Sequence, residues 1–146
     1  MVKQKGLLTV IGLGAVAVGG YLIYRVTKGK KPDLKNAVVH YTSIADDIPA
    51  NYIVTELNIQ SRLITGTADE ILTALAQYKM IITIGGQIAN PLYSAAVAQG
   101  LVPEITTPGQ KVVKSIETAG VVIFFVAGYT ASDTFAAAQD FVKQSK

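Results

Sequence analysis

One stretch near the amino terminus constrains this chain more than any other, because nineteen consecutive residues, Gly6–Tyr24, carry no charge. A helix of about 20 apolar residues can cross the ~30 Å hydrocarbon layer of a bilayer. Basic residues stand on both sides of the stretch, and Tyr21 and Tyr24 lie at its carboxyl end, where headgroups favour aromatic rings. The pattern therefore predicts an uncleaved helix that spans a membrane once.

Small residues within this stretch suggest how such a helix would pack. Ala15 and Gly19 are four residues apart, and small residues at this spacing let two helices approach closely in a bilayer. Three other interpretations of the stretch remain open. Residues 12–17 resemble the start of a dinucleotide-binding turn, residues 15–17 resemble a signal-peptide cleavage site, and residues 5–7 resemble an archaeal pilin processing site.

The distribution of charge divides the chain into three parts. Residues 1–35 contain seven Lys and Arg against one acid, whereas residues 36–146 contain six against nine. We therefore expect a membrane anchor with basic flanks at 1–27, a hinge at 28–35 and an α/β domain at 36–146. The domain has no basic stripe for phosphates, so a nucleic-acid partner is not expected. The basic carboxyl flank favours a cytoplasmic domain.

Composition excludes several classes of catalytic site. The chain has no cysteine and one histidine, so it has neither a thiol nucleophile nor the ligands of a thiolate or multi-histidine metal site. His40 lies in an apolar stretch, where a buried structural histidine is the simpler interpretation. The adjacent acids Asp46 and Asp47 would point apart on a helix and are interpreted as helix-start charges. We predict no enzyme activity and no cofactor.

After residue 36, apolar runs of strand length alternate with helix signals. The predicted strands are 37–41, 62–65, 80–84, 111–117 and 121–126, and the predicted helices are 49–60, 91–98, and two that begin after Thr67 and Thr130. Both threonines are followed three residues later by an acid, the spacing of a capping box. The alternation predicts a small, mostly parallel sheet covered by helices, a Rossmann-like α/β fold.

Glycine-rich turns follow two of the apolar strands and make the most site-like feature of the chain. In open parallel sheets, ligands bind at the carboxyl ends of strands, and the following helix offers free amide groups. The candidate residues for binding a ligand or a partner are Gly85, Gly86, Asn90, Gly128, Tyr129 and Thr130. The simpler interpretation is that the glycines form tight turns and Asn90 caps a helix. Neither turn contains Lys or Arg, which disfavours phosphate.

Two segments carry a resemblance to a known family. Residues 81–92, IITIGGQIANPL, and residues 122–134, VIFFVAGYTASDT, resemble two signatures of archaeal S-layer-like proteins, in the family's order. Gln87 and Ser132 stand where those signatures have Pro and Glu. The resemblance covers about residues 36–142 and implies an α/β domain like the carboxyl-terminal region of that family.

The resemblance implies a structural role. It suggests a non-enzymatic, membrane-anchored protein of an archaeal envelope or archaeal-virus membrane, with an extracytoplasmic domain. The expected partners are the lipid bilayer and either copies of the chain or other envelope subunits. Two alternatives stay open: an accessory subunit of a larger membrane complex, and an α/β module that binds a small ligand such as a sugar or nucleotide.

Overall fold

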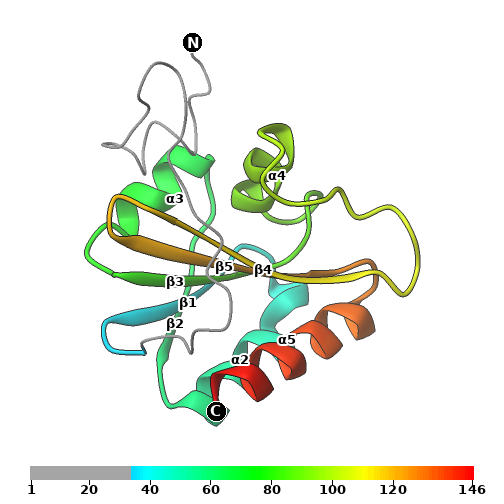
Figure 1. Ribbon diagram of the computed structural model, residues 1–146, viewed down its shortest axis with the longest axis horizontal. Helices are drawn as coiled ribbons and strands as arrows, with labels where there is room; N and C mark the ends of the chain where they lie inside the picture. Colours follow the sequence, from blue (N-terminus) through cyan, green and yellow to red (C-terminus); the bar gives the residue numbers. More distant parts are fainter. Residues whose placement is uncertain (1–33) are drawn as a thin grey trace.

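The computed structural model describes residues 34–146, which form a small α/β fold around a mixed five-stranded sheet (Figure 1). The strands are β1 (Ala37–Tyr41), β2 (Gln60–Leu63), β3 (Met80–Ile84), β4 (Lys111–Thr118) and β5 (Val121–Gly128). A 3-10 turn, η1 (Ile44–Asp46), precedes the helices α2 (Asp47–Leu57), α3 (Ala68–Ala74), α4 (Pro91–Ala98) and α5 (Ala131–Ser145).

The sheet has the strand order β2-β1-β3-β5-β4. The first four strands in this order are parallel, and β4 pairs antiparallel with β5 along its whole length. The two are joined by Ala119 and Gly120, which have φ of 53° and 80°, so this is a tight hairpin with both turn residues in the left-handed region. The predicted mostly parallel sheet is therefore confirmed, with one antiparallel strand at its edge.

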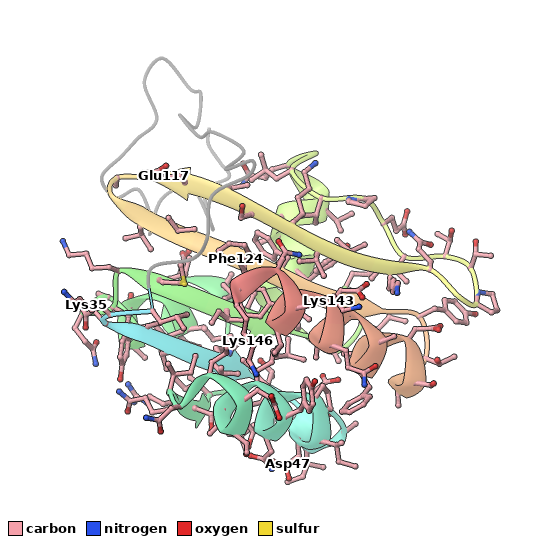
Figure 2. All side chains as sticks on the ribbon, turned by 60° about the horizontal axis from the view of Figure 1, so that its bottom comes forward. Lys35, Asp47, Glu117, Phe124, Lys143 and Lys146 are labelled. Atoms are coloured by element: carbon pink, nitrogen blue, oxygen red, sulfur yellow. The ribbon has the colours of Figure 1, made fainter. Side chains whose placement is uncertain are left out.

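Helices cover both faces of the sheet and bury its apolar strands. On one face, α3 and α4 pack over side chains such as Ile81 and Phe125, and on the other, α2 and α5 pack over Ile82 and Phe124 (Figure 1). Figure 2 shows α2 and α5 side by side in front of this second face. Because β3 and β5 are buried on both faces, they read as continuous apolar runs in the sequence.

Local signals position the helix starts. Thr67 and Glu70 form a capping box at α3, Thr130 and Asp133 form one at α5, and the Asn90 side chain caps α4. All three helix starts were predicted from the sequence, as were the bounds of β1 and β3.

The bounds of α2 and β2 differ from the prediction at both ends, whereas β4 and β5 only extend one and two residues further at their carboxyl ends. The helix α2 begins at Asp47 rather than Pro49, so Pro49 lies within its first turn. A proline is tolerated there, because the N–H groups of the first turn have no hydrogen-bond partner within the helix and the missing N–H costs nothing. It ends at Leu57 rather than near Gln60, because Asn58 adopts φ 55° and stops the helix. The early stop leaves room for β2 to begin at Gln60, two residues before its predicted start.

The predicted anchor, with Ala15 and Gly19, and most of the predicted hinge lie outside the described residues. Within residues 34–146, no helix is both long and apolar enough to cross a membrane.

Candidate functional site

A cavity of about 420 Å³ opens at the carboxyl ends of the parallel strands. Its walls come from η1 after β1, the turn after β3, the end of β5 and the first turn of α5, together with Ile105 from the segment between α4 and β4. In the sheet, β2 lies on one side of β1 and β3 lies on the other, so the order in which the chain adds strands reverses between β1 and β3. Open α/β sheets bind ligands at such a reversal point. We call this feature the edge cavity.

The structure brings together four of the six predicted site residues. Gly86, Gly128, Tyr129 and Thr130 all line the edge cavity, although they come from two different strand ends. Gly85 and Asn90 are buried and do not line the cavity. The strand-end rule thus predicted residues that line one cavity, although it did not separate wall residues from supporting ones.

The two wall glycines have different roles. A Cβ atom on Gly128 would lie 2.3 Å from the backbone carbon of Asp133 and 2.4 Å from the Thr134 nitrogen, so only glycine lets β5 meet the start of α5. A Cβ atom on Gly86 would meet only the tip of Ile105 at 3.3 Å and the Gly128 oxygen at 3.9 Å. Gly128 is therefore structural, whereas Gly86 keeps space open in the cavity.

Asn90 belongs to a buried polar group that we call the His40 cluster: His40, Thr83, Asn90 and the Ile64 carbonyl. Asn90 Nδ2 donates to Thr83 Oγ1 at 2.8 Å and also to the Ile84 carbonyl at 2.9 Å. Thr83 Oγ1 lies 2.8 Å from His40 Nδ1, and His40 Nε2 lies 3.1 Å from the Ile64 carbonyl. A carbonyl only accepts, so Nε2 carries the proton and the Thr83 hydroxyl donates to Nδ1.

The surroundings of His40 keep its ring neutral. The side chain is fully buried, and burial lowers the pKa of His40 to about 4. Every polar atom of the imidazole has a partner, and the cluster joins β1, β3 and the start of α4. The geometry supports the structural interpretation of this histidine.

Asp46 is the wall residue that the sequence interpretation missed. Its side chain is only 8% exposed, and its Oδ2 atom is buried without a hydrogen-bond partner among the described residues. It precedes α2, yet its side chain makes no capping bond there. Oδ2 lies against Gly85, where a Cβ atom would come within 2.7 Å of it. Burial raises the pKa of the Asp46 carboxyl to about 6.

A second missed residue, Gln87, fixes one wall of the cavity. Its Nε2 donates to the Ile105 carbonyl at 2.7 Å, and its Oε1 accepts from the Ile105 N–H at 3.1 Å. Both ends of the side-chain amide are thus occupied within the fold. The sequence offered only one signal for Asp46, an acid just after a predicted strand, and none for the long-range contact of Gln87.

The threonine side chains of the wall are also engaged inside the fold. Thr130 Oγ1 accepts from the Asp133 N–H at 3.0 Å, and Thr134 Oγ1 lies 3.2 Å from the Thr130 carbonyl to which it donates. Asp133 accepts from the Gly109 and Thr130 N–H groups, and these bonds hold its pKa below the usual value. Within the described part of the chain, no Lys or Arg lines the cavity.

Exposed apolar side chains gather around the same edge. Residues 34–146 expose five large hydrophobic side chains, and each stands at or after the carboxyl end of a parallel strand: Ile44, Ile48, Leu63, Ile88 and Tyr129. Ile88 is 97% exposed, and both Ile88 and Tyr129 line the cavity. The edge cavity therefore combines an apolar rim with one buried carboxyl oxygen in its wall, Asp46 Oδ2, that has no partner among the described residues. The other such oxygen in residues 34–146, Asp69 Oδ1, does not line the cavity.

The chain was compared with known proteins by sequence and by structure. No family model matches it, and no curated protein matches it. Among solved structures, it is similar to the C-terminal domain of the CTP1L endolysin, in a mutant that reduces autoproteolysis. That similarity has a TM-score of 0.45 and 18% identity over 77% of this chain and 100% of that one. The crystal structure of the CTP1L endolysin matches with a TM-score of 0.41 and 18% identity, over 75% and 98% of the two chains.

These matches correct the expected family. The structures found are those of an endolysin and not of a surface-layer protein, so the resemblance to the archaeal S-layer-like family is wrong. The role that it implied, a membrane-anchored surface protein of an archaeal envelope or virus, is wrong with it. At 18% identity and these TM-scores, the matches carry no argument about a shared activity.

Proposed function

We propose that residues 36–146 form a binding module that takes up a small molecule in the edge cavity without transforming it. The observation that supports this most directly is the state of the cavity wall. Gln87, Thr130 and Thr134 use their polar groups inside the fold, whereas Asp46 Oδ2 has no partner among the described residues. A buried polar group without a partner is costly, and a ligand that supplies one would be stabilised.

The position and shape of the cavity agree with this role. Its volume of about 420 Å³ falls within the usual range of small-molecule sites, ~300–1,000 Å³. It stands at the reversal point of the sheet, on turns held by Gly128 and Gln87. The walls are thus formed before any ligand arrives, which lowers the entropy cost of binding.

Two features support binding without catalysis. The one histidine is neutral and fully bonded within the His40 cluster, so it has no free nitrogen for proton transfer. The cavity wall holds a single carboxyl group, whereas acid–base chemistry on a substrate generally needs a second group placed opposite the first. A nucleic-acid partner is not part of the proposal, because residues 36–146 hold nine acids against six Lys and Arg.

The test is thermal unfolding of the full chain with a panel of sugars, nucleotides and small amines. A ligand that binds only the folded state raises the melting temperature, with about 2.7 kcal/mol of stabilisation at a hundred times its Kd. The same ligand should shift the NMR amide signals of Gly86, Ala89 and Tyr129.

A matched pair of variants locates the binding. Ala131 lines the cavity, and Ser132 next to it is exposed and does not. Ala131→Leu should abolish the thermal shift, and Ser132→Leu should leave it unchanged. If no member of the panel raises the melting temperature or moves these amides, the proposed binding function is wrong.

A further inference from the structure

We infer that the molecule bound in the edge cavity carries a positively charged amine, which pairs with the carboxylate of Asp46. This inference rests on the proposed binding function and names the class of ligand for that same site.

The first argument is the cost of leaving Asp46 unpaired. A buried carboxylate is stable when a cation or several hydrogen-bond donors compensate its charge. The structure gives its buried oxygen, Oδ2, no donor among residues 34–146, and the start of α2 supplies no capping bond to the side chain. A ligand ammonium group would provide both a charge of opposite sign and donors.

The second argument is that the described part of the protein offers no cation of its own at this place. The positively charged side chain that stands closest along the chain to the wall segments, Lys111, forms an ion pair with Asp140 at 2.8 Å. The charged side chains that directly adjoin wall residues in the sequence are acids: Asp47 accepts from the Tyr41 hydroxyl at 2.8 Å, and Asp133 is bonded to the Gly109 and Thr130 amides. Glu104 adds a further acid on the segment that carries Ile105. Lys143 stands on α5 beyond the residues that line the cavity. An amine therefore meets acids beside the wall, and the nearby Lys111 is already paired with Asp140.

The third argument concerns the rest of the ligand. Ile88 and Tyr129 stand exposed at the cavity wall, so the ligand can bury an apolar body against them. The ring of Tyr129 also favours a nearby cation. Together with Asp46, these side chains fit an amine attached to an apolar or aromatic group.

The experiment compares benzylamine with benzyl alcohol, which have similar shapes and differ in charge. Binding to the full chain is followed by the amide shifts of Gly86 and Tyr129, at pH 7.5 and at pH 5.0. We expect benzylamine to bind at least tenfold more tightly than benzyl alcohol at pH 7.5. Protonation of Asp46 at pH 5.0 should weaken benzylamine about tenfold, because its pKa is about 6, and should leave benzyl alcohol unchanged.

Two acids that are neighbours in the sequence supply the control. Asp46→Asn should remove the preference for benzylamine. Asp47→Asn makes the same change in net charge at a residue that does not line the cavity, and it should leave the preference unchanged. In the unaltered protein, saturating benzylamine should also lower the pKa of Asp46 by at least one unit, read from its carboxyl carbon signal.

The outcomes separate this inference from the proposed function. If benzyl alcohol, or a neutral member of the panel, binds at these amides as tightly as benzylamine, the charge requirement is wrong and the binding function stands. Benzylamine binding that survives Asp46→Asn also overturns the inference. If neither probe nor any member of the panel binds, the proposed function itself is wrong.

Discussion

The His40 cluster and the edge cavity each contain one buried titratable group, His40 and Asp46, which are six residues apart in the sequence. Their hydrogen bonding differs. In the cluster, each polar atom of the imidazole has a partner, and the ring is held neutral. In the cavity, Asp46 is nearly as deeply buried, and its Oδ2 atom has no partner among the described residues. Satisfied polar groups hold a fold together, whereas a buried polar atom without a partner lowers the stability of the fold, and at Asp46 this cost is the basis of the proposed binding.

Both groups depend on the same strand ends. Thr83 and Gly85 are two residues apart at the end of β3. Thr83 belongs to the His40 cluster, and Gly85 lies against Asp46. Thr83 stands directly across from His40 in the register of the sheet, and Gly85 gives Asp46 the room to pack against the backbone. The end of β3 thus supports both the His40 cluster and the position of Asp46 in the cavity wall.

The largest effect should come from breaking the His40 cluster with Thr83→Val. Valine keeps the shape of threonine and removes the hydroxyl, which leaves His40 Nδ1 buried without a donor and removes one acceptor from Asn90. We expect the free energy of unfolding to fall by about 2–4 kcal/mol in urea titrations.

Thr42→Val is the control for that change. Thr42 Oγ1 donates to the Ile64 carbonyl, which still accepts from His40 after the substitution. The loss should stay below about 1 kcal/mol. Equal losses for the two variants would mean that the cluster is no more than a set of independent hydrogen bonds.

A smaller effect, of opposite sign, is expected for Asp46→Asn. The pKa of Asp46 is raised from 3.8 to about 6, so the folded state holds a proton that the unfolded state has already released, and stability falls as the pH rises from about 4 to about 6. Asparagine removes that penalty. The variant should be more stable by about 2 kcal/mol at pH 7.5 and no more stable at pH 3.5, as measured by urea unfolding.

His40 supplies an internal check on that pH series. Its pKa is lowered from 6.5 to about 4, so its contribution to stability is lost as the pH falls through this range. The two slopes oppose one another in the unaltered protein between about pH 4 and pH 6, and only the slope of His40 remains in Asp46→Asn. Asp47→Asn should change stability by less than about 0.5 kcal/mol. A destabilised Asp46→Asn protein at pH 7.5 would show that the carboxylate has a partner in solution.

The smallest effect on stability should come from Gly86→Ala. The new methyl group meets only the flexible tip of Ile105 at 3.3 Å, so we expect a change within about 1 kcal/mol. Ligand binding should nevertheless weaken, because the methyl group occupies cavity space. The melting temperature with and without ligand measures both. A loss of stability well above that size would contradict the view that the cavity side of this turn is loosely packed.

The sequence predicted the fold well where the signals are local. The capping boxes at Thr67 and Thr130 and the apolar run of β3 depend on residues within one turn or one strand, and the starts of both helices and the bounds of β3 were predicted. The glycines after β3 and at the end of β5 also lie at the carboxyl ends of the strands, as predicted. The antiparallel direction of β4 was not predicted, because it follows from the left-handed turn at Ala119 and Gly120.

The site was harder to predict because its defining residues are far apart in the sequence. Asp46 is significant only because the chain buries it beside Gly85, 39 residues later, and gives it no partner. An acidic pair at a helix start gives no sign of burial. The prediction of the family was wrong for a related reason. The two segments that carried the resemblance are short apolar runs with glycine turns, and any buried parallel strand followed by a helix requires this pattern.

The contact between Gln87 and Ile105 has a consequence for how the domain can diversify. One side-chain amide reproduces the paired donor and acceptor of a strand neighbour, so the segment that carries Ile105 is attached to the sheet without belonging to it. The exposed residues on either side of that attachment can be exchanged without disturbing strand register. A library that varies the exposed residues 103, 104 and 106–108, with Gln87, Ile105 and the glycine turns unchanged, would therefore alter selectivity on a constant scaffold.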